Sequence, residues 1–221
     1  LLCSLGVWQW GRAEQKRQFL DQQQQAMQAP AVNLKISELA SVQRYQPVVV
    51  RGHFDGQHSF LIDNQIQAGK AGYWVMTPFI CAENKRAILV NRGWVALNTD
   101  RSQLPDVTVA SQAVTIKGRI NHFPQPGWVL EGAEIPTENW PAAVQIIKPS
   151  VVEQRLGYPV AHVQIELDAE QPHGYSRQWH APVTIPPEKH RAYAVQWFGL
   201  AVTLTALFIW LAFKNTREPS A

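Results

Sequence analysis

The strongest pattern in the chain is an uninterrupted apolar stretch near its C-terminus, from Ala192 to Phe213. It contains no charged side chain, and Gln196 is its only strongly polar residue. At the rise of an α-helix the stretch is about 33 Å long, which is enough to cross the hydrocarbon layer of a membrane. The pattern therefore predicts a transmembrane helix over residues 190–214, followed by a short tail over residues 215–221. We expect Gln196 to hydrogen-bond to a neighbouring transmembrane helix.

The alternative is a buried helix of a soluble core, which needs a large domain to cover an apolar helix on every side. A chain of 221 residues with a mean hydropathy of −0.20 has little material for that. Lys214 and Arg217 follow the stretch directly, so the positive-inside rule predicts a cytoplasmic C-terminus. Lys189 and Arg191, at the other end of the stretch, weaken this bias.

The N-terminal residues are also apolar, but only over half the length of a membrane span. We interpret residues 1–11 as the outer half of a first transmembrane helix, with Trp8 and Trp10 at the interface. The helix formers that follow predict that this helix continues into solvent as far as Pro30. Two spans then place both termini in the cytoplasm and hold residues 12–189 outside an inner membrane, as a periplasmic domain of a multi-pass protein.

Alternating and β-branched runs within this domain predict six or seven strands. The runs cover residues 48–54, 58–63, 72–80, 86–97, 114–123, 144–148 and 162–167. We expect the first two to form a hairpin through Asp55-Gly56, and the next two to form another through Glu83-Asn84. Short helices are predicted over Ser37–Gln43, with Ser37 as N-cap, and over 149–157. The sum is an α+β membrane protein with a predominantly antiparallel, small barrel-like sheet domain.

Charge and cysteine content exclude several classes of protein. The formal net charge is +3 without a block of basic residues, which gives no support for a nucleic-acid partner. Cys3 and Cys81 lie far apart and form neither a CxxC pair nor a CxxCH haem attachment. The chain has no nucleophile elbow, P-loop, dinucleotide-binding fingerprint or HExxH motif, so we expect it not to be an enzyme.

Candidate ligands and carboxylates lie around the turn at residue 55. His53 and His58 are able to meet across the expected hairpin and bind a metal, but two histidines beside a turn are more commonly surface residues. Asp55 and Asp63 belong to the same hairpin, and carboxylates near turns commonly cap backbone groups.

The outer boundary of the C-terminal helix carries the more informative residues. His190, Tyr193 and Trp197 are spaced so that a helix places them on one face. A neutral imidazole there is a competent axial ligand for haem iron, and the indole is able to pack against the porphyrin. Lys189, Arg191 and Arg12 are candidates to meet the haem propionates. From the residues alone, an aromatic belt at the lipid interface is the plainer interpretation of the same pattern.

Five ordered segments resemble one known family: LGVWQWGRAEQK, VRGHFD, GYWVMTPF, ILVNRGWV and HRAYAVQWFGL. They are similar to the bacterial members of the surfeit locus protein one family, membrane proteins that assist assembly of cytochrome c oxidase. The resemblance covers nearly the whole chain and implies two transmembrane helices around an extracytoplasmic domain. It also implies haem a binding by His190, as axial ligand of the iron, and by Trp197. Tyr193 and Gly52 match the family's motifs as a membrane anchor and a close-packed strand glycine.

Two hypotheses follow from the resemblance and the residues together. The first is a non-enzymatic assembly factor that binds haem a transiently and assists its insertion into oxidase subunit I, or stabilises an early assembly intermediate. Its partners are subunit I, the lipid bilayer and other assembly factors. The second is a cofactor-free, membrane-anchored scaffold for oxidase subunits. Its contact points would be exposed tryptophans, and the candidates are Trp74, Trp94, Trp128 and Trp140. Tryptophans of this kind are more commonly packed in the core.

Overall fold

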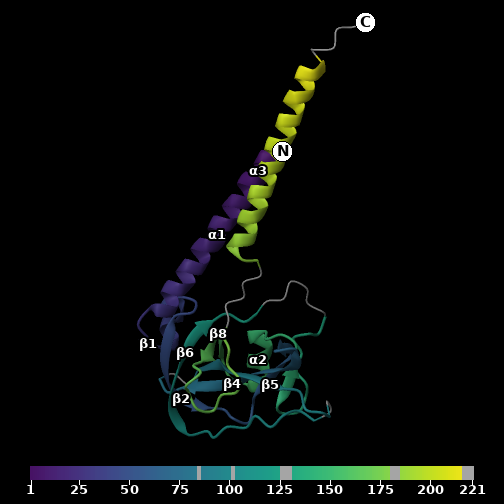
Figure 1. Ribbon diagram of the computed structural model, residues 1–221. Helices are drawn as coiled ribbons and strands as arrows, with labels where there is room; N and C mark the ends of the chain where they lie inside the picture. Colours follow the sequence, from purple (N-terminus) through teal and green to yellow (C-terminus); the bar gives the residue numbers. More distant parts are fainter. Residues whose placement is uncertain (84–85, 101–102, 125–130, 180–184, 216–221) are drawn as a thin grey trace. The chain divides into compact units, whose positions relative to one another are not determined.

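The computed structural model describes the chain except residues 84–85, 101–102, 125–130, 180–184 and 216–221 (Figure 1). The chain divides into two compact units. Both ends of the chain form the first unit, Leu1–Gln24 with Ala181–Ala221, and Gln25–His180 form the second.

The first unit consists of two long helices, α1 (Leu2–Gln28, whose last turn belongs to the second unit) and α3 (Pro187–Asn215). Among the described residues, α3 is the one helix long and apolar enough to cross a membrane, over Pro187–Lys214. Only 6% of its most apolar window is buried, whereas a core helix of a soluble protein is mostly buried. These observations support the predicted C-terminal span and argue against the soluble alternative. The N-terminal helix continues almost to Pro30, as predicted. The membrane span predicted for its first residues, 1–11, stays a prediction.

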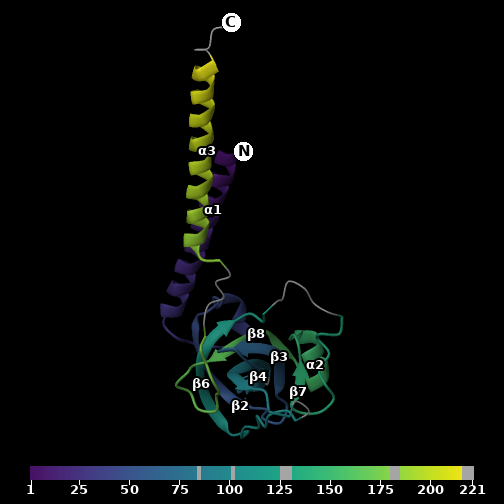
Figure 2. The same cartoon turned by 45° about the vertical axis from the view of Figure 1, so that its right-hand side comes forward.

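Within this unit α1 and α3 run side by side in opposite directions (Figures 1 and 2). Two small residues, Gly6 on α1 and Ala194 on α3, are buried, which indicates that they lie where the helices meet. A Cβ atom at Gly6 would lie 2.7 Å from the ring of Phe198. The glycine therefore leaves the space that this ring fills, as small residues do at contacts between membrane helices.

The second unit contains one eight-stranded sheet and a short helix. The strands are β1 (Val32–Asn33), β2 (Pro47–Phe54), β3 (Phe60–Gln67), β4 (Lys70–Cys81), β5 (Ala87–Ala96), β6 (Ala113–Asn121), β7 (Ala142–Val144) and β8 (Val160–Leu167). Their order is β1-β2-β6-β8-β5-β4-β3-β7, and β2 also pairs with β4. The pairs β1–β2, β3–β7 and β5–β8 are parallel, and the others are antiparallel. The predicted α+β class with a mostly antiparallel sheet is confirmed. Its barrel-like form stays a prediction, which the β2–β4 pairing supports.

The core lies around the middle strands. In β5 the seven residues from Ala87 to Gly93 are all buried, so this strand is covered on both faces. One apolar cluster joins β2, β4 and β8, where the rings of Phe54 and Phe79 meet edge to face at 5.0 Å. A second cluster contains Val152 of α2 (Pro149–Leu156), which lies to one side of the sheet (Figure 2).

The expected hairpin between residues 48–54 and 58–63 is wrong. β2 pairs with β1, β4 and β6, whereas β3 pairs with β4 and β7. The chain does turn at Asp55, where the His58 amide donates to the Asp55 carbonyl at 3.3 Å, but this turn connects two strands that do not pair with each other. The Asp55 amide donates instead to the carbonyl of Pro78 on β4. Gly56 lies directly against the backbone of Val109, where a Cβ atom would overlap the carbonyl oxygen. The long strand β4 thus joins β2 and β3 by pairing with each of them.

Two shorter elements also differ from expectation. The helix predicted over Ser37–Gln43 is a 3-10 helix, η1 (Ile36–Ser41), and its N-cap position is Lys35 where Ser37 was predicted. Six residues are too few to propagate an α-helix without tertiary support. The strand predicted at 144–148 is β7, which ends at Val144.

The remaining expectations agree with the structure. The antiparallel β4–β5 pair is confirmed, although Asn84 of its predicted turn lies outside the described residues. Helix α2 ends at Gly157, whose φ of 76° closes the helix in the left-handed region. Gly52 is close-packed as expected, because a Cβ there would overlap the carbonyl oxygen of Ile80.

Candidate functional site

The polar contact between the two long helices involves His190. This residue lies in the first turn of α3 and is 9% exposed. Its Nδ1 atom lies 2.7 Å from the side-chain oxygen Oε1 of Gln9 on α1. An amide oxygen only accepts hydrogen bonds, so Nδ1 donates and the other ring nitrogen, Nε2, keeps its lone pair. Nε2 has no hydrogen-bond partner among the residues that the structure describes.

The other predicted site residues share the helix with His190. Ala194, one turn further along, is fully buried, and Trp197 is half-buried. Tyr193 is 50% exposed. Within the described part of the chain, no hydrogen bond or ring contact joins His190, Tyr193 and Trp197 to one another. The structure thus connects His190 with Gln9, and it leaves the two aromatic side chains available beside it.

Cationic side chains lie next to His190 in the sequence. Lys189 is exposed and Arg191 is half-buried, and neither side chain forms an ion pair with any described residue. Arg12 on α1 is exposed and donates to the side chain of Gln15 over 3.2 Å. The start of α3 therefore carries two cations whose charge is not neutralised by a described carboxylate.

Gln196, expected to bond the helices to each other, does not do so. It is exposed and has no hydrogen-bond partner among the described residues. Gln9 fills that role instead, and sequence reasoning missed it. A signal was present, because Gln9 stands between Trp8 and Trp10 in an apolar stretch, where an amide needs a partner as much as Gln196 does.

The polar centre of the sheet domain is Arg92, in the segment NRGWV. Its side chain is buried and donates to the carbonyls of His173, at 2.7 Å, and Val107, at 2.7 Å, and to the hydroxyl of Thr77 at 3.2 Å. Burial lowers the pKa of the guanidinium, and the nearby Tyr175 opposes this shift. Arg92 thus ties β5 to two separate loops, which is a structural role.

A second buried polar network lies between β6 and β8. The carboxylate of Glu166 accepts from Arg119 at 2.5 Å and from Asn121 at 2.6 Å. Arg44 in turn donates to Asn121 at 2.8 Å. Glu166, Arg119 and Asn121 thus link β6 to β8, while the Nη2 atom of Arg119 is buried without a hydrogen-bond partner among the described residues. The contacts indicate that this network holds the strands together.

The described residues give no support to a metal site at His53 and His58, which the sequence already made the less common alternative to surface histidines. His58 bonds to Asp55 at 2.8 Å, and Asp55 also accepts from the Tyr158 hydroxyl at 2.6 Å. His53 is exposed on β2 and does not join them. Asp63 caps the backbone amide of Asn64, as carboxylates near turns commonly do. No group of three metal-ligating side chains occurs among the described residues.

The tryptophans proposed as contact points of a scaffold are mostly core residues. Trp74 and Trp140 are partly buried and pack against the apolar cluster around α2. Trp94 is also half-buried, and its indole donates to the carbonyl of Gln65 at 2.9 Å. Trp128 lies outside the described residues.

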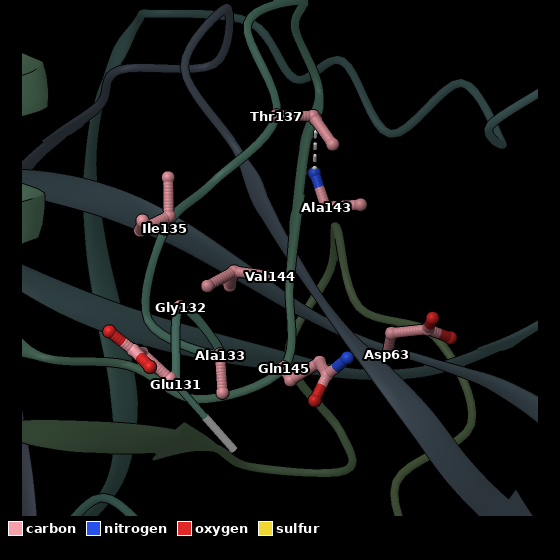
Figure 3. A pocket seen from close by; sticks show the side chains of 9 residues that line it. All are labelled: Asp63, Glu131, Gly132, Ala133, Ile135, Thr137, Ala143, Val144 and Gln145. Carbon is pink, nitrogen blue, oxygen red and sulfur yellow. Dashed lines mark hydrogen bonds between the residues drawn. The ribbon is translucent and has the colours of Figure 1, made fainter. Parts of the chain in front are cut away.

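Two hollows stand out among the described residues of the sheet domain. Neither contains His190, Tyr193 or Trp197, although Asp63 lines one of them and His53 the other. Figure 3 shows the smaller one, of about 310 Å³, with the carboxylates of Asp63 and Glu131 on opposite sides of its lining. The larger, of about 780 Å³, lies beside β2 and includes His53 and Cys81. The larger lining also includes Glu83, but among the described residues no hydrogen bond joins the side chains of Cys81, His53 and Glu83 to one another. Burial raises the pKa of the Cys81 thiol, which disfavours the reactive thiolate.

The fold and the site define a sheet domain joined to a helix that is long and apolar enough to cross a membrane and that carries a histidine in its first turn. This chain belongs to the SURF1 family, whose sequence model matches residues 1–202. It is 26% identical over 224 residues to the SURF1-like protein of Rickettsia felis, covering 95% of this chain and 91% of that protein. It is 28% identical over 235 residues to Surfeit locus protein 1 of Xenopus tropicalis, covering 93% of this chain and 70% of that protein. The resemblance seen in the sequence motifs is therefore confirmed.

Proposed function

We propose that this protein is a biogenesis factor of cytochrome c oxidase that holds haem a at the start of α3 and assists its insertion into oxidase subunit I. The proposal rests on membership of the SURF1 family, on the apolar helix and on the state of His190. In this proposal haem a is a cargo that the protein takes up and releases. We expect no catalytic activity.

The observation that carries the proposal is the pairing of one imidazole nitrogen and not the other. Nδ1 of His190 is held by Gln9, so Nε2 remains as the ligand atom. Haem iron accepts a neutral imidazole nitrogen as an axial ligand. A single protein ligand suits a protein that must release its cargo, because a second strong ligand would slow the transfer.

Residues on both sides of His190 supply the rest of the binding surface. Trp197 and Tyr193 are incompletely buried and offer aromatic faces to a porphyrin. Lys189 and Arg191 are cations without a described counter-ion, and carboxylates of the haem propionates would supply one. Charged groups of this kind are tolerated at the headgroup level.

The proposed topology is that of a multi-pass protein of the inner membrane. Both termini lie in the cytoplasm and the sheet domain lies in the periplasm, with the lipid bilayer, subunit I and other assembly factors as partners. The support for it is the apolar α3 with Lys214 in its last turn, together with the long α1 that runs beside α3.

Titration with haem tests the site directly. The full-length protein in detergent should shift the Soret band of added haem a, and His190→Ala should abolish the shift. His162→Ala is a matched control, because His162 is an exposed histidine on β8. Identical binding by wild type and His190→Ala would refute the ligand assignment.

A cellular test separates haem delivery from the scaffold hypothesis. Membranes of a bacterial strain lacking the gene are compared with those of strains complemented by wild type or by His190→Ala. Loss of haem a absorbance in both the deletion strain and the variant supports ligation by His190. Full recovery with the variant, and co-purification of subunit I with it, supports a cofactor-free scaffold instead.

A further inference from the structure

We propose that Gln9 is a positioning residue for His190: it fixes the Nδ1-protonated tautomer and the ring orientation, so that Nε2 is the nitrogen presented to the iron. The inference deepens the proposed function and rests on it for the identity of the cargo. Its first part, the tautomer, is a property of the protein alone.

The geometry of the pair supports this role. The distance from Nδ1 to the Gln9 oxygen, 2.7 Å, is at the short end of the range for N–H···O hydrogen bonds. His190 is 9% exposed, so little water competes with the amide for the ring. A hydrogen bond in such surroundings is stronger than the same bond in water. Rotation of the ring by half a turn would break it and leave Nδ1 facing away from its acceptor.

The packing of the two helices explains why a glutamine reaches the ring. Gly6 lies one turn before Gln9 on α1, and Ala194 lies one turn after His190 on α3. Both are buried and small, and Phe198 fills the space above Gly6. Small residues allow helices to approach closely, which brings side chains of moderate length into direct contact.

The chemistry of the partner is that of an orienting residue in a metal site. Histidines that bind metals almost always donate their other ring N–H to a carboxylate, a carbonyl or water. The acceptor fixes the tautomer and makes the ligating nitrogen more basic. Gln9 supplies this acceptor from the other helix, so the ligand is set up only where α1 and α3 lie together.

The first experiment measures the tautomer without haem. Full-length protein with ¹⁵N-labelled histidine is studied in detergent by long-range ¹H–¹⁵N NMR, and the His190 signals are assigned by their absence in His190→Ala. Wild type should show a protonated Nδ1 and an unprotonated Nε2 at a pH where the ring is neutral. Gln9→Leu should lose this preference, and Gln9→Glu should keep it because a carboxylate is also an acceptor. Gln196→Leu is the control, since that exposed glutamine has no described partner.

The second experiment measures haem affinity and the spectrum of the bound haem. Gln9→Leu should weaken binding about 10- to 100-fold, the usual effect of removing an orienting partner. Gln9→Glu should restore affinity, and Gln196→Leu should match wild type. A merely structural role for Gln9 would not be rescued by glutamate and would leave the tautomer unchanged.

The two experiments distinguish failure of the inference from failure of the proposed function. An unprotonated Nδ1 in wild type, or equal tautomers in wild type and Gln9→Leu, overturns the inference. Haem binding by wild type that does not depend on His190 overturns the proposed function, while the expected tautomers would still support Gln9 as the residue that sets the His190 ring.

Discussion

The thiol of Cys81 provides a quantitative test of how tightly the sheet domain is closed. Cys81 ends β4 and is 5% exposed. Burial, reinforced by the carboxylate of Glu83, raises the pKa of this thiol from 9.0 to about 12. The thiolate is the reactive form, and each pKa unit changes its fraction about tenfold, so at pH 8 the folded protein should hold about 1,000-fold less thiolate than an open chain.

The assay is labelling by a maleimide in a Cys3→Ser background, so that Cys81 is the one thiol followed. Folded protein in detergent should react about 1,000-fold more slowly than denatured protein at pH 8, with a rate that rises about tenfold per pH unit. The control adds Ala113→Cys and Cys81→Ser, which moves the thiol to an exposed position on β6. Labelling of folded Cys81 within about tenfold of the denatured rate would refute the burial from which the raised pKa is argued.

The same shift makes stability depend on pH in a defined direction. Between pH 9 and pH 12 the unfolded chain releases the Cys81 proton while the folded chain retains it, so rising pH favours unfolding. This one group should lower the free energy of unfolding by about 1.4 kcal/mol per pH unit above pH 9. Denaturant titrations at several pH values should show a shallower decline in Cys81→Ala than in wild type, and equal slopes would contradict the linkage.

Three further substitutions test the packing of the sheet domain. Gly52→Ala places a methyl group on a backbone carbonyl of β4 and should destabilise the fold by at least about 1–3 kcal/mol through overpacking. The melting temperature in detergent should fall accordingly, and an unchanged melting temperature would contradict the close approach. Arg92→Met leaves three acceptors without their donor, two of them in buried hydrogen bonds, and should cost about 3 kcal/mol in denaturant titrations. An unaltered midpoint would be the opposing result. Tyr158→Phe removes one hydrogen bond to Asp55, whose carboxylate still bonds to His58. Calorimetry should therefore show a smaller loss in the free energy of unfolding, about 1 kcal/mol. A loss as large as that of Arg92→Met would be inconsistent with these contacts.

The sequence alone determined the elements whose cause is local. Residues 192–213 predict α3 because an apolar run of that length has few other stable environments. The β4–β5 pair follows from two β-rich runs that are close together in the chain, and α2 from a proline at its start and Gly157 at its end. The same spacing argument placed His190, Tyr193 and Trp197 on one helix, since helical periodicity needs no tertiary information.

Only the tertiary structure decided which distant groups meet. The neighbours of β2 are β1, β4 and β6, and not β3, the next strand in the chain. Strand pairing depends on side-chain packing against distant strands, which the sequence of one strand does not reveal. Arg92 finds its acceptors in two loops that carry no recognisable motif. Gln9 and His190 are 181 positions apart, and their hydrogen bond exists because small residues let two helices approach. Local propensity determines elements, whereas long-range packing determines the partners that give a histidine its chemistry.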